Sequence, residues 1–521
     1  MSAHNPSAAE HGEKTYISHL EKQDAKSSTH VVEEDVVDAA ARGHAATDIH
    51  GQPLVHFDPE AEKRLVRKID LYVVPTVALL YLWCFIDRAN IGNARLAGLE
   101  KDLGLKGYQY NILLTSFYIS YIIFEIPCNL MCKVVGPGKW LPFLTFGFGL
   151  FSMLTGFATN FSNAAGIRFL LGVFESGMLP GIAYYMSRWY RKAELGFRLA
   201  LYIVMAPLAG AFGGLLASGI LKLNGIGKVH TWQQLFIIEG IITMGLAIIS
   251  FFTLTDRPST ARWLTDEEKA LAIARVKSEN VGTTEVLEKI DSKKVMRGIF
   301  NPNTIMTSVI FLFDNITVQG LAFFLPTIVA TIYPKQSVIQ KQLHTVPPYI
   351  VGAFFVVALP FLTWKTGRSL VFFVFSAPLM MVGYIMFLAS TNPHVRYGAT
   401  FLITSGAFVF GPLCNAQVAT NVLSDTARSS AIGMNVMFGN IGGLISTWAF
   451  LPFDGPNYPI GNGLNLATSS MILILSLVLW AYLIYDNRRR DKVDVDAKLA
   501  GMTEEQISDL DWKHPGHRWH Y

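Results

Sequence analysis

Two groups of six long apolar segments, separated by a polar stretch, constrain the fold of this chain more than any other feature. The segments cover residues 71–92, 109–132, 139–160, 164–187, 198–222 and 233–255, and then 303–332, 345–364, 369–390, 396–423, 428–451 and 464–486. Each approaches or exceeds the roughly 20 apolar residues with which a helix spans a bilayer. The sequence therefore predicts an all-α integral membrane protein, with 12 transmembrane helices in two pseudo-symmetric six-helix halves.

The composition argues against a soluble protein and against an enzyme. The chain is 51% hydrophobic and only 16% charged, whereas a soluble protein carries about a quarter charged residues. Cys84, Cys128, Cys132 and Cys414 all fall in apolar segments, without the spacing of a zinc site or a disulfide framework. Because no nucleotide-binding loop, metal-ligand cluster or nucleophile–base set is found, we expect no enzymatic activity, cofactor, metal or nucleic-acid partner.

Basic residues gather at alternate ends of the apolar segments. With the N-terminus inside, the inner ends carry groups such as Arg64–Lys68, Arg188–Arg198 and Arg488–Arg490, and the outer connections carry fewer. This asymmetry is the positive-inside pattern, and it predicts that both termini are cytoplasmic. We expect the protein to lie in the plasma membrane.

Polar segments flank and divide the two halves. The predicted organisation is a disordered cytoplasmic N-terminal tail (1–63), an N-terminal half (64–255), a cytoplasmic linker with a short helix (256–300), a C-terminal half (301–486) and a cytoplasmic C-terminal tail (487–521). Asp58 and Pro59 form a helix start before the first span. Thr265 with Glu268 forms a capping box in the linker, and "MTEEQISDL" repeats that arrangement near the C-terminus.

Four ionisable residues lie where the first and fourth spans should cross the membrane. Asp87 and Arg88 are adjacent in "LWCFIDRANIGNARL", and Arg168 and Glu175 stand seven residues apart. Seven residues are close to two helical turns, so the latter pair shares one face about 10 Å apart along the axis. A charge near the bilayer centre costs roughly 3 kcal/mol, so these groups are expected to face the interior, where pairing lowers that cost.

The chemistry of these groups divides between two roles. Arginine stays protonated and can hold a carboxylate through two parallel hydrogen bonds, whereas a partly buried carboxylate can take up and release protons. We therefore expect Arg88 and Arg168 to bind an anionic substrate and Asp87 and Glu175 to couple protons. An anion that competes for an arginine would free a carboxylate to protonate. The alternative is that the four groups form interhelical salt bridges that only fix packing.

Other polar residues are candidates for the cavity or for gating. Glu125, which precedes Pro127 by two residues, favours a packing or gating bond. Asp314 begins a polar face with Asn315 and Gln319 that is a candidate for lining the cavity, and Asn440 is a further candidate for substrate contact. Glycine-rich stretches in the fifth and eleventh spans would let helices approach closely and rock.

The residues also carry a family resemblance. The segments "RKIDLYVVP", "YLWCFIDRANIGNARLAGL", "FEIPCNL" and "RFLLGVFESGMLPGIAYYMSRWY" resemble those of fungal major facilitator transporters of the anion:cation symporter group, in the allantoate permease branch that includes nicotinate permeases. In more distant members of this group, an Asp-Arg pair in span 1 and an Arg and Glu seven apart in span 4 bind substrate and couple protons. Asp87, Arg88, Arg168 and Glu175 match that pattern.

Taken together, these features favour proton-coupled symport of a small organic anion by alternating access. Allantoate, nicotinate, a related vitamin or another small carboxylate would satisfy two arginines, and the sequence does not choose among them. Two alternatives stay open: an exporter of a small metabolite driven by proton antiport, and a nutrient-sensing receptor with a transporter fold. The expected partners are the anion, protons and the lipid bilayer, and the expected oligomeric state is a monomer.

Overall fold

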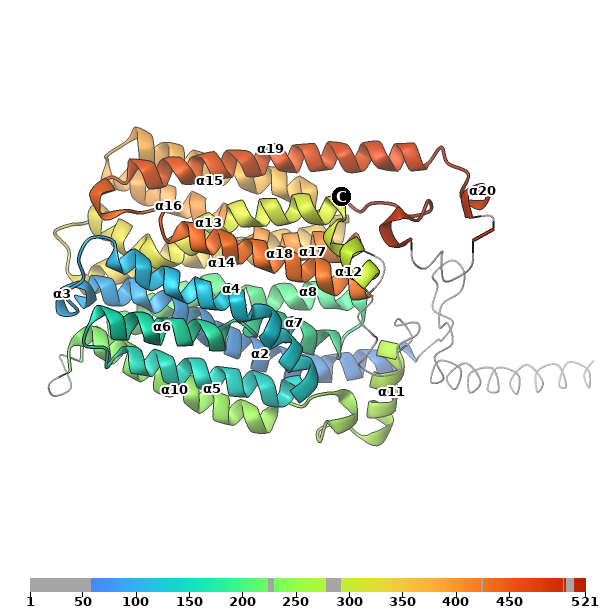
Figure 1. Ribbon diagram of the computed structural model, residues 1–521, viewed down its shortest axis with the longest axis horizontal. Helices are drawn as coiled ribbons and strands as arrows, with labels where there is room; N and C mark the ends of the chain where they lie inside the picture. Colours follow the sequence, from blue (N-terminus) through green and yellow to red (C-terminus); the bar gives the residue numbers. More distant parts are fainter. Residues whose placement is uncertain (1–57, 224–228, 278–291, 423–424, 500, 503–509) are drawn as a thin grey trace, which may run out of the picture. The chain divides into compact units, whose positions relative to one another are not determined.

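A computed structural model describes residues 58–223, 229–277, 292–422, 425–499, 501–502 and 510–521 (Figure 1). Most of the predicted N-terminal tail and the capping motif expected near the C-terminus lie outside these residues. The chain divides into two units. The small unit comprises the described parts of residues 1–68, 189–192 and 257–288, and the large unit comprises those of 69–188, 193–256 and 289–521.

The small unit contains the start of the first long helix, α2 (Pro59–Leu96). Asp58 Oδ1 accepts a hydrogen bond from the backbone N–H of Glu60 at 3.1 Å, and Oδ2 accepts one from that of Ala61 at 3.2 Å. These bonds satisfy N–H groups that have no partner within the helix, and Pro59 fits the first helical position because it has no N–H. The helix start predicted from the sequence is confirmed.

The small unit also holds the 3-10 turn η1 (Pro258–Thr260) and α11 (Asp266–Lys277). Glu268 N–H donates to Thr265 Oγ1 at 3.3 Å, and Glu268 Oε2 accepts from Thr265 N–H at 2.9 Å. These two bonds confirm the predicted capping box. Lys68 Nζ lies 2.7 Å from Glu268 Oε2, and its hydrogen bond lowers the pKa of the Glu268 carboxyl.

The large unit contains the long apolar helices. They are α2 from Ile69 onward, α4 (Gln109–Val135), α5 (Pro137–Thr155), α6 (Phe161–Glu175) with α7 (Met178–Ser187), α8 (Lys192–Ile203) with α9 (Met205–Leu221), α10 (Thr231–Thr253), α13 (Pro302–Ile332), α14 (Val338–Thr366), α15 (Leu370–Ala389), α16 (Pro393–Ala407) with α17 (Phe410–Thr420), α18 (Asp425–Ser446) and α19 (Pro459–Arg490). Shorter elements are α3 (Leu99–Asp102), α12 (Ser292–Ile299), η2 (Pro452–Asp454), α20 (Val495–Leu499) and η3 (Asp511–Lys513).

These helices account for the 12 predicted spans, and the predicted fold class is confirmed. Ten of them are long and apolar enough to cross a membrane. The other two are α5 and α18, whose lower hydropathy follows from Lys139 and Pro142 in α5 and from the polar first turns of α18 around Arg428. No β-strand occurs in the part of the chain that the structure describes.

Three of the spans are each divided into two helices by one or two residues. The fourth is divided after Glu175, where α6 ends, and the fifth and tenth are divided between α8 and α9 and between α16 and α17. The dividing residues keep right-handed helical backbone angles, so each pair of helices continues in one span.

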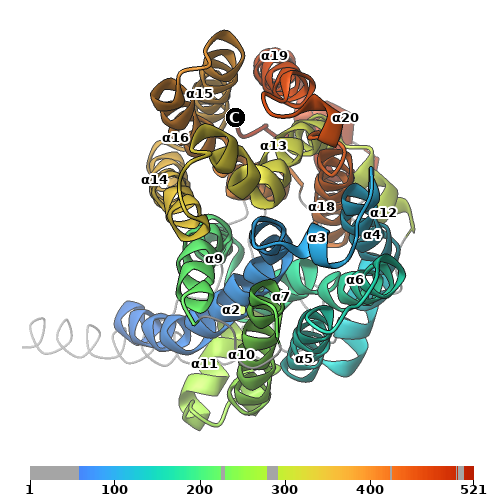
Figure 2. The same ribbon diagram turned by 90° about the vertical axis from the view of Figure 1, so that its left-hand side faces the viewer.

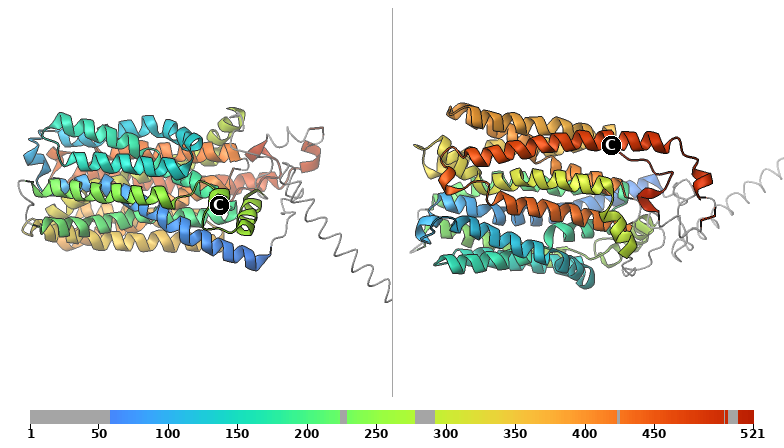
Figure 3. Two further views of the ribbon diagram at one scale, coloured as in Figure 1. Left: turned by 90° about the horizontal axis from the view of Figure 1, so that it is seen from below. Right: turned by 45° about the horizontal axis from the view of Figure 1, so that its top comes forward.

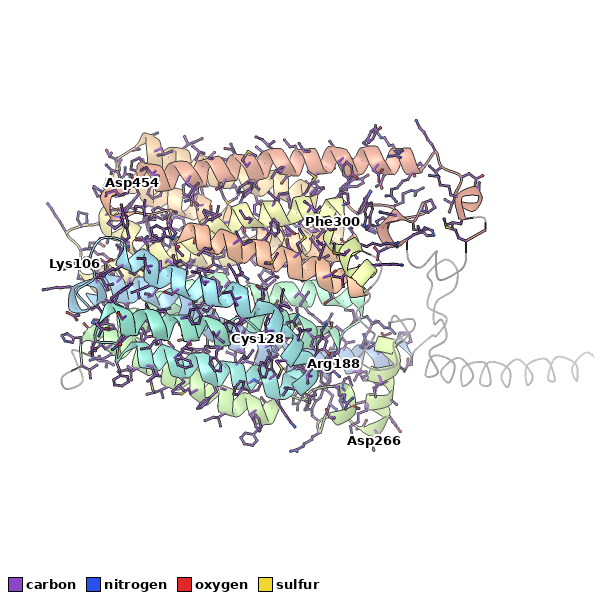
Figure 4. All side chains as sticks on the ribbon, in the orientation of Figure 1. Lys106, Cys128, Arg188, Asp266, Phe300 and Asp454 are labelled. Carbon is purple, nitrogen blue, oxygen red and sulfur yellow. The ribbon has the colours of Figure 1, made fainter. Side chains whose placement is uncertain are left out.

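The long helices of the large unit run side by side (Figures 1 and 3). The N-half, α2 to α10, and the C-half, α13 to α19, form two groups in the view of Figure 2. We name the two ends of this bundle by their short helices: Lys106 and Asp454 lie at the α3 end, and Phe300 lies toward the α12 end (Figure 4). Within the most apolar stretch of each helix, 83% of α13 is buried but only 33% of α19, so α13 lies centrally and α19 at the periphery.

The last residues of the chain pack against the α12 end of the C-half. Trp519 is 3% exposed, and its Nε1 donates to Asp486 Oδ2 on α19 at 2.7 Å. The same carboxylate accepts from Arg490 Nε at 2.6 Å. The carbonyl oxygen of His520 accepts from Gln417 Nε2 on α17 at 3.0 Å. Residues 510–521 thus connect α17 and α19, and we call them the C-terminal segment.

Candidate functional site

A buried ion pair between α2 and α6 forms the centre of the candidate site. Arg88 Nε donates to Glu175 Oε1 at 2.6 Å, and the Nη2 group of Arg88 contacts the same oxygen. Cys84 Sγ, one turn before Arg88, donates to that oxygen at 3.3 Å. Arg88 is 5% exposed and Glu175 is fully buried. Two of the predicted site residues are therefore joined directly, although they lie on different helices.

Aromatic rings surround the Arg88 guanidinium. Its Cζ lies 5.4 Å from the ring centre of Phe85, 5.6 Å from that of Phe117 and 5.2 Å from that of Tyr121. The negative faces of such rings stabilise a cation that has lost its hydration. The rings can therefore keep Arg88 charged if Glu175 is neutralised.

Asp87 faces away from the Arg88 pair, toward two other helices. Its Oδ1 accepts from Ser152 Oγ on α5 and its Oδ2 from Thr243 Oγ1 on α10, both at 2.9 Å. The carboxyl group is fully buried. Two hydroxyl donors satisfy it without a cation, so the adjacent Asp87 and Arg88 serve different contacts.

Arg168 lies on α6 without an ion pair among the described residues. It is 3% exposed, and its Nε and Nη2 atoms have no hydrogen-bond partner there. Its Cζ lies 5.4 Å from the Phe236 ring centre on α10. The structure thus places Arg168 in the same half as Glu175 without joining the two side chains.

Glu239 on α10 is a buried carboxylate that the sequence analysis missed. It is fully buried, and neither carboxylate oxygen has a hydrogen-bond partner among the described residues. It lies one helical turn before Thr243, which donates to Asp87. The sequence contains a signal for Glu239, because this acid lies inside the sixth apolar segment just as Glu175 lies inside the fourth.

A cavity with a volume of about 70 Å³ lies between the two halves. Among the predicted residues, Arg88, Asp314, Asn315, Gln319 and Asn440 line it, whereas Asp87, Arg168 and Glu175 do not. Further lining residues that the sequence analysis did not select include Tyr81, Tyr121 and Asn415. Arg88 is therefore the predicted residue that connects the buried charges of the N-half to the cavity.

The cavity wall of the C-half combines apolar residues with four side-chain amides and one acid, Asp314. Asn440 Nδ2 donates to Glu125 Oε2 at 2.8 Å and so joins α18 to α4. Asn315 Nδ2 donates to the carbonyl oxygen of Phe311 at 3.0 Å on its own helix. Glu125 thus takes part in a hydrogen bond between the two halves, and the packing or gating role expected for it stays a prediction.

Hydrogen bonds close the two halves together at the α3 end. Asn111 Nδ2 donates to the carbonyl oxygen of Thr447 at 2.6 Å, and Trp448 Nε1 donates to Thr115 Oγ1 at 3.0 Å. Gln342 Nε2 donates to the carbonyl oxygen of Asn93 at 3.3 Å. The structure is therefore closed at this end.

Two six-helix halves that enclose a cavity with a buried charge define a membrane transporter. The sequence matches the Major Facilitator Superfamily over residues 77–447, and the chain belongs to this superfamily. It is 33% identical over 467 residues to an uncharacterized transporter of Schizosaccharomyces pombe, covering 89% of this chain and 91% of that protein. It is 32% identical over 466 residues to the MFS-type transporter cnsO of Penicillium expansum (87% and 90% covered) and 31% identical over 478 residues to the major facilitator-type transporter hxnP of Emericella nidulans (90% and 95% covered).

The fold is also that of a solved structure. A bacterial homolog of the human lysosomal transporter Spinster, in an inward-facing and unoccupied conformation, aligns with a TM-score of 0.58 over 82% of this chain and 97% of that chain. The two sequences are 16% identical, so this likeness concerns the fold alone. The relatives named above are transporters, and this chain is a transporter rather than an enzyme.

Proposed function

We propose that this transporter carries a small organic anion together with a proton, by alternating access, as a member of the anion:cation symporter group in its allantoate permease-like branch. The observation that supports this most directly is the buried ion pair of Arg88 and Glu175, whose arginine borders the cavity. We also propose that the protein lies in the plasma membrane with both termini cytoplasmic and works as a monomer.

Coupling follows from competition for one arginine. A substrate carboxylate that enters the cavity can bind Arg88 through two parallel hydrogen bonds. Glu175 then loses its partner while it stays buried, which favours its protonation because a buried charge without a partner is costly. Substrate and proton are therefore bound together, and release of the anion restores the ion pair and expels the proton.

Asp87 and Arg168 take supporting roles in this proposal. Asp87 is held by two hydroxyl groups and can serve as a second proton site. Arg168 keeps a positive charge in the same half, and its two nitrogens without a partner among the described residues are available to an anion or to a moved carboxylate.

Alternating access requires the α3 end to open. A Cβ atom added at Gly443 would lie 2.5 Å from the Tyr118 ring, and one added at Gly214 would lie 2.8 Å from Thr345 Oγ1. Glycine at both positions thus lets the halves approach each other closely, as in many membrane helix pairs. The hydrogen bonds and aromatic contacts that join the described residues of the two halves at this end must break for the halves to separate there.

The test is uptake of labelled organic anions at pH 5 and pH 7.5 into cells that express the protein. The wild type is expected to accumulate an anion faster at pH 5. Glu175→Gln is expected to lose acid stimulation but to keep exchange of internal for external substrate, because its side chain cannot carry the proton. Arg168→Ala is expected to reduce uptake at both pH values.

Two outcomes of the uptake experiment would contradict the proposal. Acid-stimulated accumulation that persists in Glu175→Gln would show that the proton travels elsewhere. Loss of a preloaded anion in exchange for protons, without uptake, would favour the exporter. Ser470→Ala is the control, because the Ser470 hydroxyl bonds only its own helix, at the carbonyl oxygen of Leu466.

A further inference from the structure

Asp314 is a buried carboxylate that borders the cavity and has no hydrogen-bond partner among the described residues. It lies on α13, whose most apolar stretch is 83% buried, and is itself fully buried. It lines the cavity, yet neither carboxylate oxygen has a hydrogen-bond partner among the described residues. A buried acid in this state is costly unless something else satisfies it.

Other buried carboxylates near the cavity have partners on neighbouring helices. Two hydroxyl groups donate to Asp87, Arg88 pairs with Glu175, and Asn440 donates to Glu125. These three carboxylates fix contacts between helices. Asp314 fixes none among the described residues, so its position on the cavity wall has no explanation in packing.

The cavity carries one cation and one acid on opposite walls. Arg88 comes from α2 in the N-half and Asp314 from α13 in the C-half, and they are the one arginine and the one carboxylic acid among the lining residues. Much of the remaining wall is aromatic or neutral, including Tyr81, Phe85 and Phe408. A molecule that takes the place of Glu175 at Arg88 and also pairs with Asp314 must therefore carry two groups of opposite sign.

We propose that the substrate is a carboxylate that also carries a protonated nitrogen, with the carboxylate on Arg88 and the nitrogen on Asp314. This inference rests on the proposed function and specifies its substrate class. The amides of Asn315 and Gln319, on the same helix as Asp314, border the cavity beside it and can orient the nitrogen. Such a substrate contacts both halves at once.

The test measures binding to the purified full-length protein in detergent, independently of transport. Each probe pair has one shape and differs by an ammonium group in place of a methyl group: β-alanine and butyrate, 6-aminohexanoate and heptanoate, and 4-(aminomethyl)benzoate and 4-ethylbenzoate. The three pairs cover three different distances between the carboxylate and the ammonium group. In at least one pair, the amine should bind at least about tenfold more tightly, since a hydrogen bond to a charged group contributes that much.

Asp314→Asn should remove this preference, and Asp314→Glu should keep part of it. Glu239→Gln is the matched control, because it removes another buried carboxylate without a described partner, one that does not line the cavity; it should change the binding of both members of a pair by the same factor. Equal binding within all three pairs would overturn the inference and leave the proposed function standing. Binding of no probe would also overturn it, and the uptake experiment then decides separately whether the proposed function stands.

Discussion

The two halves of the transporter bury ionisable groups in different ways. The N-half holds Asp87, Arg88, Arg168, Glu175 and Glu239 within its spans, and two of these form an ion pair. The C-half presents Asp314 to the cavity beside neutral amides, and it places the pair of Asp486 and Arg490 at the α12 end. The same fold repeated twice thus carries a charge network in one copy and a polar wall in the other.

This difference favours different roles for the two halves in transport. A network of mutually dependent charges can exchange partners and protons, which suits coupling. A wall of amides with one acid can distinguish substrates by hydrogen bonding, because each unmet buried group lowers affinity for the wrong molecule. Variants that disturb one half should therefore leave the role of the other intact.

The largest effect is expected when the ion pair of the N-half loses its cation. Arg88→Ala leaves Glu175 buried with only Cys84 as a donor, so the free energy of unfolding at pH 7 should fall by about 3–5 kcal/mol. Denaturant titration of the purified protein in detergent measures this change. Uptake of all anions should be abolished.

The double variant Arg88→Gln with Glu175→Gln is the control for stability. Two neutral amides can bond to each other, so most of the lost stability should return while uptake stays absent. If Arg88→Ala were as stable as the wild type, the ion pair would contribute little to the stability of the N-half. The contrast drawn between the two halves would then have no basis.

At the α12 end of the C-half, the contact of Trp519 with Asp486 is expected to matter for docking of the C-terminal segment and not for transport. Trp519→Ala removes a buried ring and the hydrogen bond to Asp486, so docking of the C-terminal segment should weaken by about 3 kcal/mol. Backbone amides of residues 510–521 should then exchange hydrogen faster. Tyr485→Ala, next to Asp486 on α19 but 68% exposed, is the control. Unchanged exchange in Trp519→Ala would contradict the packing of this segment.

Docking of the same segment should also depend on pH through His517. Burial, and then the charge of Arg490, lower the pKa of His517 to about 4. The released segment would have the ordinary pKa of about 6.5, so it binds more protons than the docked one between these values. Docking should be strongest above pH 6.5 and weaken as the pH falls toward 4, by about 2 kcal/mol between pH 7 and pH 5. Exchange rates corrected for pH measure this, and His517→Gln should flatten the dependence.

Much of the fold could be predicted from the sequence because each span carries its own signal. The length of the apolar segments and the caps at Asp58 and Thr265 are local features, and the structure confirms them. The break after Glu175 was not predicted, since nothing in the apolar run of the fourth span marks where α6 ends.

The contacts of the site could be predicted only in part. Hydropathy showed that Arg88 and Glu175 must avoid lipid, but the choice of Arg88 over Arg168 as the partner depends on how α2 and α6 pack. The two hydroxyl donors to Asp87 come from α5 and α10, more than 60 residues away along the chain. The sequence analysis selected the acids by the free-energy cost of placing a charge in the membrane. Ser152 and Thr243 carry no charge, so this criterion could not select them.

The smallest expected effect is an increase in the free energy of unfolding, whereas the other variants lower stability. It is the sharpest test of how the two halves differ. Asp314→Asn removes an acid that is costly to bury because it has no partner among the described residues, so the free energy of unfolding should rise by about 1 kcal/mol. Glu175→Gln, which removes a charge that has a partner, should lower it. Denaturant titration of both variants under one condition gives the two signs. If Asp314→Asn instead destabilised the protein as Glu175→Gln does, Asp314 would be a structural group of the C-half, and the two halves would not differ in the way their buried acids are held.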